Sequence, residues 1–347
     1  MEIQEKRSSF LNLVGFTKGE TDYFLGIPYA EPPTGDNRFE PPKSHKGWNN
    51  VLEAKEAEKQ CMQPQGEEGE LSEFFEVFLT KSGMKWWEKI ILENAAWLFA
   101  SLDFEKQQSE DCLFINIIKP SKIDNGSLPV MVWFHGGGYN FGNGDGLYIT
   151  DRFAKRDVIL VTMNYRLGPF GFFAHPLLSE TSKMGVSGNY GTLDQIQALK
   201  WVQTNIHLFG GDPDNVTIFG ESAGGASVET LVSTKLAKDL FHKAIAQSGT
   251  GLPNVLTNIR EDKGILVSAE SKGIRLAQYF LGENANINDL RKLPALEIVS
   301  IDDFQLDQDL IMMTNQIVDG YVFPESIKDA FINKNIHDLP FMVGFNG

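Results

Sequence analysis

The sequence predicts an α/β protein in which helices pack on a central, mostly parallel β-sheet. Four short runs of continuous apolar residues occupy residues 130–134, 158–163, 216–219 and 244–246. Such runs are typical of strands buried on both faces of a parallel sheet. Helical periodicity separates them, and glycine-rich turns directly follow the first and third runs. Alternating strands and helices therefore favour one layered sheet over a helical bundle or a β-sandwich.

The segment before these strands divides into two parts. The first sixty residues are rich in prolines and turn residues, which predicts short strands and extended chain. Residues 62–108 instead carry aromatic and aliphatic residues at helical spacing, in two blocks separated at Gly83. We interpret residues 62–108 as an amphipathic helical insertion. It either buries its aromatic face against the body or forms a lid over a site.

The later elements extend the same pattern to the end of the sequence. A helix is predicted where Ile196, Leu199, Val202 and Ile206 share one face. Helical segments and polar loops then alternate over 255–340, and the apolar run 341–343 follows. Because no repeat, low-complexity tract or Gly/Ser linker interrupts the chain, we expect residues 1–347 to form a single, incomplete domain.

Composition excludes several functional classes. The 347 residues carry 46 Asp and Glu against 31 Lys and Arg, a formal charge of −15. Nucleic-acid binding needs clustered basic residues, so an acidic chain without them argues against that partner. No run of 18 apolar residues is present, and the mean hydropathy is −0.21, so no membrane span is predicted.

The two cysteines, Cys61 and Cys112, leave the compartment open. They are consistent with two buried thiols in a cytoplasmic protein or with one disulfide in an exported protein. The residues after Met1 are charged and lead into no apolar core, so no signal peptide is predicted.

The motif Gly220-Glu221-Ser222-Ala223-Gly224 is the strongest chemical signal. It follows a predicted strand and precedes small residues that suit a helix, which is the context of a nucleophile elbow. A sharp strand-to-helix turn strains the serine backbone and lifts its hydroxyl toward a helix N-terminus. The alternative is an ordinary N-cap serine, but this context favours a nucleophile.

The second signal is His135-Gly136-Gly137-Gly138, which directly follows the first apolar run. Three consecutive glycines are entropically unfavourable, so packing alone is a weak explanation. Their successive N–H groups suit an oxyanion that forms when a serine attacks a carbonyl. A plain turn or a phosphate cradle is the alternative, although neither G-x-G-x-x-G nor a P-loop lysine is present.

With these motifs the sequence resembles the type-B carboxylesterase/cholinesterase family of α/β-hydrolases. The resemblance covers nearly the whole chain and is most specific around the elbow. It is carried by residues 24–30, 32–33, 35, 38–39, 109–113, 189–195, 198–202, 205–206, 209–213, 216–225, 241–245 and 247–249.

The resemblance implies a role for each matching residue. Ser222 would be the acylated nucleophile, and the N–H groups of Gly137, Gly138 and Ala223 would form the oxyanion hole. Glu221 would be a carboxylate beside the nucleophile that acts electrostatically on the catalytic histidine. The implied reaction hydrolyses a small-molecule carboxylic ester and requires no metal or organic cofactor.

The resemblance also bears on the network behind the site and on the compartment. Ser248 would support the acid–histidine pair through its hydroxyl. Cys61 and Cys112 match the family's first disulfide, which favours a bridge. A secreted or other extracytoplasmic setting follows from that bridge, while the residues alone remain compatible with the cytoplasm.

The sequence departs from the family pattern in its catalytic base and acid. In the family the acid lies just beyond the strand that residues 341–344 resemble, and the histidine follows about a hundred residues later. None of the six histidines matches the base: they are His45, His135, His175, His207, His242 and His337. We therefore expect a chain truncated at its C-terminus, and also at its N-terminus, with little or no turnover alone.

A second class of function stays open beside the esterase. Some cholinesterase-like relatives are non-catalytic interaction modules that have lost the nucleophile. The intact elbow from Gly220 to Gly225 favours an enzyme over such a module.

Overall fold

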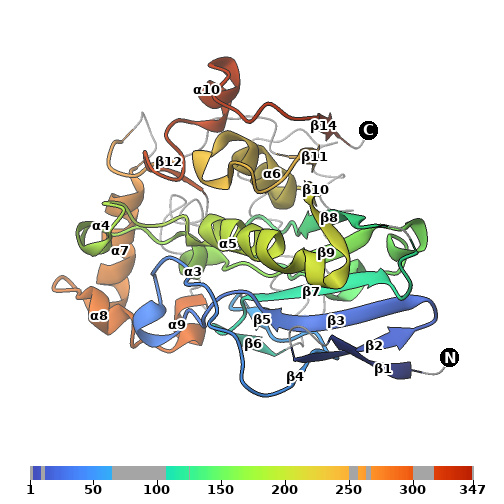
Figure 1. Cartoon of the computed structure of the whole chain (residues 1–347). Coiled ribbons are helices and arrows are strands. Elements are labelled where there is room, and N and C mark those ends of the chain that lie inside the picture. The colour runs from blue at the N-terminus through green and yellow to red at the C-terminus, as the bar shows by residue number, and fades with distance from the viewer. Residues whose placement is uncertain are drawn as a thin grey trace, which may run out of the picture.

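The computed structural model describes residues 3–8, 12–64, 107–124, 126–249, 257–262, 267–299 and 316–345. The helical insertion predicted at 62–108 falls almost wholly outside these residues. Within them, one large sheet runs through the molecule, and the two ends of the chain lie at its opposite edges (Figure 1). The expectation of a single domain over 1–347 stays a prediction.

The large sheet is mixed and joins an antiparallel side to a parallel side. The strand order is β1-β2-β3-β7-β9-β8-β10-β11-β14, with β4 (Leu52–Glu53) paired to β2. The antiparallel side contains β1 (Ile3–Ser8), β2 (Leu13–Lys18), β3 (Thr21–Pro28) and β7 (Phe114–Pro120). The parallel side contains β9 (Ile159–Met163), β8 (Leu128–Phe134), β10 (Gly211–Glu221), β11 (Lys243–Gln247) and β14 (Phe341–Gly344).

The four apolar runs read from the sequence are the four central strands of this parallel side. They are β8, β9, β10 and β11, and each pairs in parallel with its neighbour in the order β9-β8-β10-β11. The predicted α/β fold with a mostly parallel sheet is confirmed. The turn-rich first sixty residues form the short strands that extend this sheet on its antiparallel side.

Alternation along the strands separates two apolar layers. On β8, Val130, Val132 and Phe134 belong to the main core, whereas Trp133 belongs to a second cluster on the other face. Two long helices, α5 (Tyr190–Asn205) and α6 (Ala223–Ser233), contribute their apolar side chains to the main core. The larger apolar layer therefore lies between these helices and one face of the sheet.

The remaining elements surround this framework (Figure 1). They include the helices α3 (Gly168–Phe172), α4 (Pro176–Thr181), α7 (Ala269–Leu281), α8 (Ile287–Leu290), α9 (Ala295–Val299) and α10 (Ile327–Ile332). Two short pairs complete them: β5 (Gln60–Cys61) with β6 (Gln108–Ser109), and β12 (Thr257–Asn258) with β13 (Ile317–Val318).

A disulfide joins Cys61 to Cys112 at the β5–β6 pair, with Cα atoms 4.9 Å apart. This confirms the pairing that the family resemblance implied. Both residues are buried in the main core. The bridge therefore fixes both ends of the 62–108 insertion to the body of the sheet.

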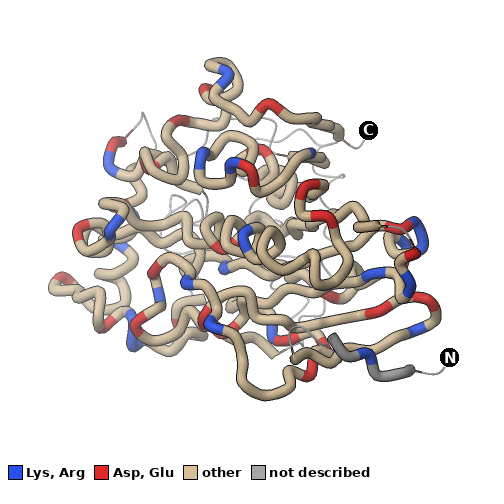
Figure 2. The backbone as a smooth tube through the Cα atoms, viewed as in Figure 1, with Lys and Arg blue, Asp and Glu red and all other residues tan. Residues whose placement is uncertain are grey.

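Positions of both charge signs are dispersed along the described chain, without a continuous basic stripe (Figure 2). Among the helices that the structure describes, none combines the length and the apolar character that a membrane crossing needs.

Candidate active site

Ser222 occupies the turn between β10 and α6 in a strained backbone conformation. Its φ is 56° and its ψ is −122°, outside the regions that residues with a Cβ normally adopt. Its backbone is held on both sides: the N–H donates to Gln247 O at 2.9 Å, and the carbonyl accepts from Ala226 N at 2.9 Å. The sharp strand-to-helix turn that the sequence predicts at this serine is therefore present in the structure.

Glycines flank the serine because the neighbouring backbone passes too close for a side chain. A Cβ on Gly220 would lie 2.5 Å from the Gly224 carbonyl group. A Cβ on Gly224 would lie 2.0 Å from Phe134 O, at the end of β8. The first turn of α6 therefore packs directly on the strand that leads into the glycine loop.

The glycine loop, residues 135–138, runs alongside the serine. A Cβ on Gly136 would lie 3.2 Å from the Ser222 Cβ. Gly137 and Gly138 have φ values of 105° and 61°, where glycine is the residue that fits without strain. Within the described part of the chain, the N–H groups of Gly137, Gly138 and Ala223 have no protein acceptor. These three predicted donors are therefore available to a bound group.

His135 anchors the loop and remains neutral. Its side chain is buried, its Nδ1–H donates to Gly136 O at 2.8 Å, and its ring stacks on Tyr165 at 4.3 Å. The Tyr165 hydroxyl donates to the His135 carbonyl at 2.8 Å. Burial lowers the pKa of His135 to about 4. The ring is thus a structural part of the loop, as expected from its sequence position.

The two predicted supporting residues lie on either side of the nucleophile turn. Glu221 is half-buried, and a Cβ on Gly136 would lie 3.4 Å from its Oε2. Burial raises the pKa of Glu221. Ser248 follows β11 with φ of 46°, and its N–H donates to Gly344 O of β14 at 2.7 Å. The predicted site residues thus lie at the ends of neighbouring parallel strands.

Among the described residues, no ring nitrogen of the six histidines is hydrogen-bonded to the Ser222 hydroxyl. Several rings bind backbone instead: His242 Nδ1 accepts from Val216 N, and His337 Nε2 pairs with Thr234 O. The expectation that the triad histidine lies outside this chain stays a prediction.

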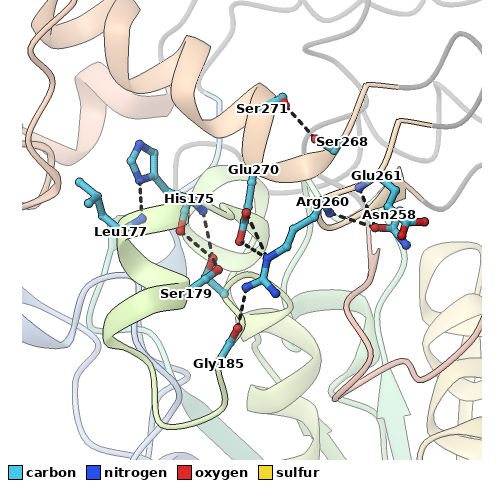
Figure 3. A network of polar contacts seen from close by, with 11 residues as sticks. His175, Leu177, Ser179, Gly185, Asn258, Arg260, Glu261, Ser268, Glu270 and Ser271 are labelled. Atoms are coloured by element: carbon cyan, nitrogen blue, oxygen red, sulfur yellow. Dashed lines mark hydrogen bonds and ion pairs between the residues drawn. The ribbon is translucent and has the colours of Figure 1, made fainter.

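His175 lies in a separate cluster that also contains serines and a glutamate (Figure 3). Its Nδ1 accepts from Leu177 N at 3.2 Å, which leaves that nitrogen unable to receive a serine proton. Ser179 and Ser187 pair with each other at 2.7 Å, and Glu270 lies 3.4 Å from Arg260. Arg260 also donates to Gly185 O at 2.8 Å, so it links Glu270 of α7 to the loop after α4, and the cluster does not have the arrangement of a second catalytic triad.

Two buried side chains at the site escaped the sequence analysis. Glu229 lies on α6, two turns after Ser222, with a buried Oε2 that has no hydrogen-bond partner among the described residues, and burial raises its pKa. Gln63 lies two residues after Cys61 and bonds the loop at Gly142. Because each is an isolated polar residue outside any motif, the sequence gives no sign that either one is buried beside the site.

The described residues contain no cluster of three or more His, Cys, Asp and Glu arranged to hold a metal ion. The fold and the site together define a class of protein. A serine on a strained turn after a parallel strand, beside a glycine loop with available N–H groups, is the arrangement of an α/β-hydrolase.

Comparison with known proteins gives the family. The model of the carboxylesterase family matches residues 12–347. The chain is 36% identical over 339 residues to fumonisin B1 esterase of Sphingopyxis macrogoltabida, which covers 95% of the chain and 53% of that protein. It is 36% identical over 346 residues to carboxylesterase 1D of Mus musculus, which covers 97% of the chain and 56% of that protein.

Solved structures agree. A PNB esterase superposes with a TM-score of 0.74 at 33% identity, over 96% of this chain and 61% of that chain. A carboxylesterase of Geobacillus stearothermophilus gives a TM-score of 0.74 at 32% identity, over 96% of this chain and 59% of that chain. The chain belongs to the carboxylesterase family, and it spans little more than half the length of the curated relatives it matches.

Proposed function

We propose that the protein containing this chain is a serine hydrolase of carboxylic esters that acts through an acyl-enzyme on Ser222. The observation that carries the proposal is the strained Ser222 turn beside a glycine loop with three available N–H groups. A strained serine backbone is favoured at a functional site, where it presents the hydroxyl in one direction. Family membership supports the same chemistry.

The reaction follows from these groups. The Ser222 oxygen forms a bond to the ester carbonyl carbon, and the carbonyl oxygen becomes an oxyanion that accepts from Gly137, Gly138 and Ala223. Each such donor contributes about 3 kcal/mol to the transition state. The Ser222 proton passes to the base during the attack, and collapse of this intermediate breaks the C–O ester bond while the base returns that proton to the departing alcohol oxygen. A water molecule then attacks the acyl carbonyl and releases the carboxylic acid, which restores the Ser222 hydroxyl.

Two further residues would act on the proton path. Glu221 would place a half-buried carboxylate beside the nucleophile, where a negative charge favours a protonated histidine base. Ser248 would orient the acid that pairs with that base, from its position between β11 and β14. The base and acid themselves are proposed to come from outside residues 1–347, so the chain by itself should show little or no turnover.

The proposed substrate is a small-molecule carboxylic ester, and the proposed mechanism requires no cofactor. One relative is named as an esterase of fumonisin B1, and others are named simply as carboxylesterases. These names share the hydrolysis of an ester but do not share one alcohol or one acid as the product. The Cys61–Cys112 disulfide supports an extracytoplasmic setting.

The experiment compares two polypeptides. The first is residues 1–347, and the second extends the reading frame beyond Gly347. We expect the longer protein to hydrolyse p-nitrophenyl acetate and to be labelled by a fluorophosphonate probe at Ser222, with both lost in Ser222→Ala. We expect the shorter chain to show neither at an enzyme-like rate. Labelling of a residue other than Ser222 in the longer protein would refute the proposed nucleophile.

A further inference from the structure

An open groove lies on the body of the protein, between the loop at residues 44–48 and one side of α5. Its volume is about 710 Å³, within the roughly 300–1,000 Å³ that is usual for small-molecule sites. None of the residues around it belongs to the Ser222 turn or to the glycine loop. The lining consists of Asn12, Pro28, Tyr29, Ser44, His45, Gly47, Trp48, Gln197, Lys200, Trp201, Thr204 and Asn205.

Two tryptophans, one from each wall, are held in place while remaining partly exposed. Trp48 comes from the loop, and its Nε1–H donates to Asn12 O at 3.2 Å. Trp201 comes from α5 and packs against Phe209 with ring centroids 6.2 Å apart. Anchored aromatic rings that remain partly in water offer a flat apolar surface to a ligand without a large entropy loss on binding.

The loop wall is fixed against the helix rather than free. The Gln197 Nε2 of α5 donates to Ser44 Oγ at 3.1 Å, and Ser44 also pairs with Ala30 in an isolated β-bridge. His45 Nδ1 accepts from Gly47 N at 3.0 Å, so the proton of the neutral ring resides on Nε2. The groove is therefore preformed, with donors in defined positions.

The polar lining is of the kind that recognises hydroxyl groups. Side-chain amides and hydroxyls come from Ser44, Gln197, Thr204 and Asn205. The Thr204 hydroxyl and the Asn205 amide each donate one bond to the α5 backbone, at Lys200 O and Trp201 O, and their oxygens remain as acceptors. The Trp201 indole N–H adds a donor that has no protein acceptor within the described residues. A pyranose ring matches this mixture, because one of its faces is made of C–H groups and its rim carries hydroxyls.

The charge on the groove lining distinguishes acidic from neutral saccharides. Lys200 is exposed at the groove and forms no ion pair with any residue that the structure describes. No Asp or Glu lines the groove, although the chain as a whole carries −15. A local cation without a neighbouring carboxylate on an acidic protein favours a ligand with a carboxylate of its own.

We propose that this groove binds a short acidic oligosaccharide built of uronic acid units. The sugar faces stack on Trp48 and Trp201, and the amides of α5 bond the hydroxyls. Lys200 pairs with a uronate carboxylate. This binding site does not depend on ester hydrolysis. A failure of the proposed reaction would therefore leave the binding proposal intact, and a failure to bind would leave the proposed reaction intact.

Isothermal titration of the chain with tri-galacturonic acid tests the proposal, with cellotriose as the neutral probe. We expect the acidic probe to bind with a Kd of about 0.1–1 mM, which corresponds to a modest site. Trp201→Ala should weaken binding about tenfold or more, whereas Trp201→Phe should retain most of it. Lys200→Gln should weaken binding about three- to fivefold and remove its salt dependence.

Controls separate binding from folding and from catalysis. Tyr279→Ala removes another exposed aromatic, on α7, and should bind as the wild type does. Ser222→Ala should also bind normally. Unfolding curves of each variant verify that it is folded. The proposal is wrong if tri-galacturonic acid does not bind, if cellotriose binds equally well, or if folded Trp201→Ala and Lys200→Gln retain full affinity.

Discussion

The side-chain amide of Gln63 is bonded to both backbone groups of Gly142. Gly142 N donates to Gln63 Oε1 at 2.9 Å, and Gln63 Nε2 donates to Gly142 O at 3.2 Å. Gln63 lies two residues after the disulfide residue Cys61, and Gly142 lies four residues after the end of the glycine loop, residues 135–138. A Cβ on Gly142 would lie 2.6 Å from His135 Nδ1. The disulfide segment is thus tied to the loop beside the nucleophile.

Replacing Gln63 should therefore loosen the glycine loop. Gln63→Leu leaves both Gly142 groups buried without partners, so we expect it to lower the free energy of unfolding by about 1–3 kcal/mol. Gln63→Glu keeps the acceptor for Gly142 N–H but places a second acceptor against the Gly142 carbonyl. We therefore expect it to lower the free energy of unfolding by as much as Gln63→Leu does, or by less. Urea unfolding measures both. In the longer protein, Gln63→Leu should lower kcat more than it raises KM.

The matched control for that change is Gln278→Leu, at an exposed position on α7. It should alter the unfolding free energy by no more than about 0.5 kcal/mol. Equal stability of Gln63→Leu and wild type would show that the Gly142 contacts contribute nothing to the fold.

The strained backbone at Ser222 predicts that glycine stabilises the fold more than alanine at this position, which is the reverse of the usual order. At most positions alanine is more stabilising than glycine by about 0.5–1 kcal/mol. At φ of 56° and ψ of −122° the order should reverse, because strain of about 1–3 kcal/mol falls on any residue with a Cβ. We expect Ser222→Gly to be more stable than Ser222→Ala by about 1 kcal/mol in urea unfolding. Ser222→Ala being the more stable of the two would mean that the turn is relaxed in solution.

Sequence patterns predicted the strands and the sharp turn at Ser222 because both depend on local chemistry. Strands that are buried on both faces carry runs of mostly apolar residues, so the buried segments of β8, β9, β10 and β11 are recognisable in the sequence. Ser222 and Gly137 lie in motifs whose glycines are required by close backbone approach. Each of these signals is formed by residues that are consecutive in the chain.

Contacts between distant segments gave no such signal. Gln63 and Gly142 are 79 positions apart, and neither residue type indicates the other. The bounds of the antiparallel strands were not predicted either, because β2 (Leu13–Lys18) and β3 (Thr21–Pro28) carry glycine and polar residues among their apolar ones and show no clean alternation. The catalytic roles of Glu221 and Ser248 came from family resemblance alone, since an acidic residue and a serine after strands fit many structures.

Burial of His135 predicts a loss of stability in acid. Its folded pKa is about 4 against an ordinary 6.5, so between these values the unfolded chain binds a proton that the folded chain does not. Stability is therefore unaffected near pH 7 and falls below pH 6.5, by on the order of 3 kcal/mol at pH 4.

His135→Asn isolates this effect. Asparagine retains a donor for Gly136 O but does not titrate, so the difference in unfolding free energy between variant and wild type should shrink as the pH falls from 7 to 5. The raised pKa values of Glu221 and Glu229 act in the opposite direction, because those carboxyls bind protons first in the folded state. They are present in both proteins and cancel in the difference. A difference that does not change with pH would refute a neutral buried His135.

The β14 strand predicts how residues 1–347 behave in solution. β14 pairs with β11 along one edge, and no strand of the described chain pairs with its other edge. Three apolar side chains are exposed here, with Met342 at 65%, Val343 at 50% and Phe345 at 66%. An apolar, unpaired edge favours strand-to-strand association. We expect concentration-dependent self-association in analytical ultracentrifugation, together with low solubility.

A charge on that edge should reduce the association, because lysine on an edge strand opposes pairing. Val343→Lys is therefore expected to raise the monomer fraction. Leu147→Lys is the matched control, since Leu147 is 68% exposed but lies in a short 3-10 turn away from the sheet edge. If both substitutions raise the monomer fraction equally, general charge rather than the β14 edge governs association. If the wild-type chain is monomeric at tens of micromolar, the edge does not drive association at all.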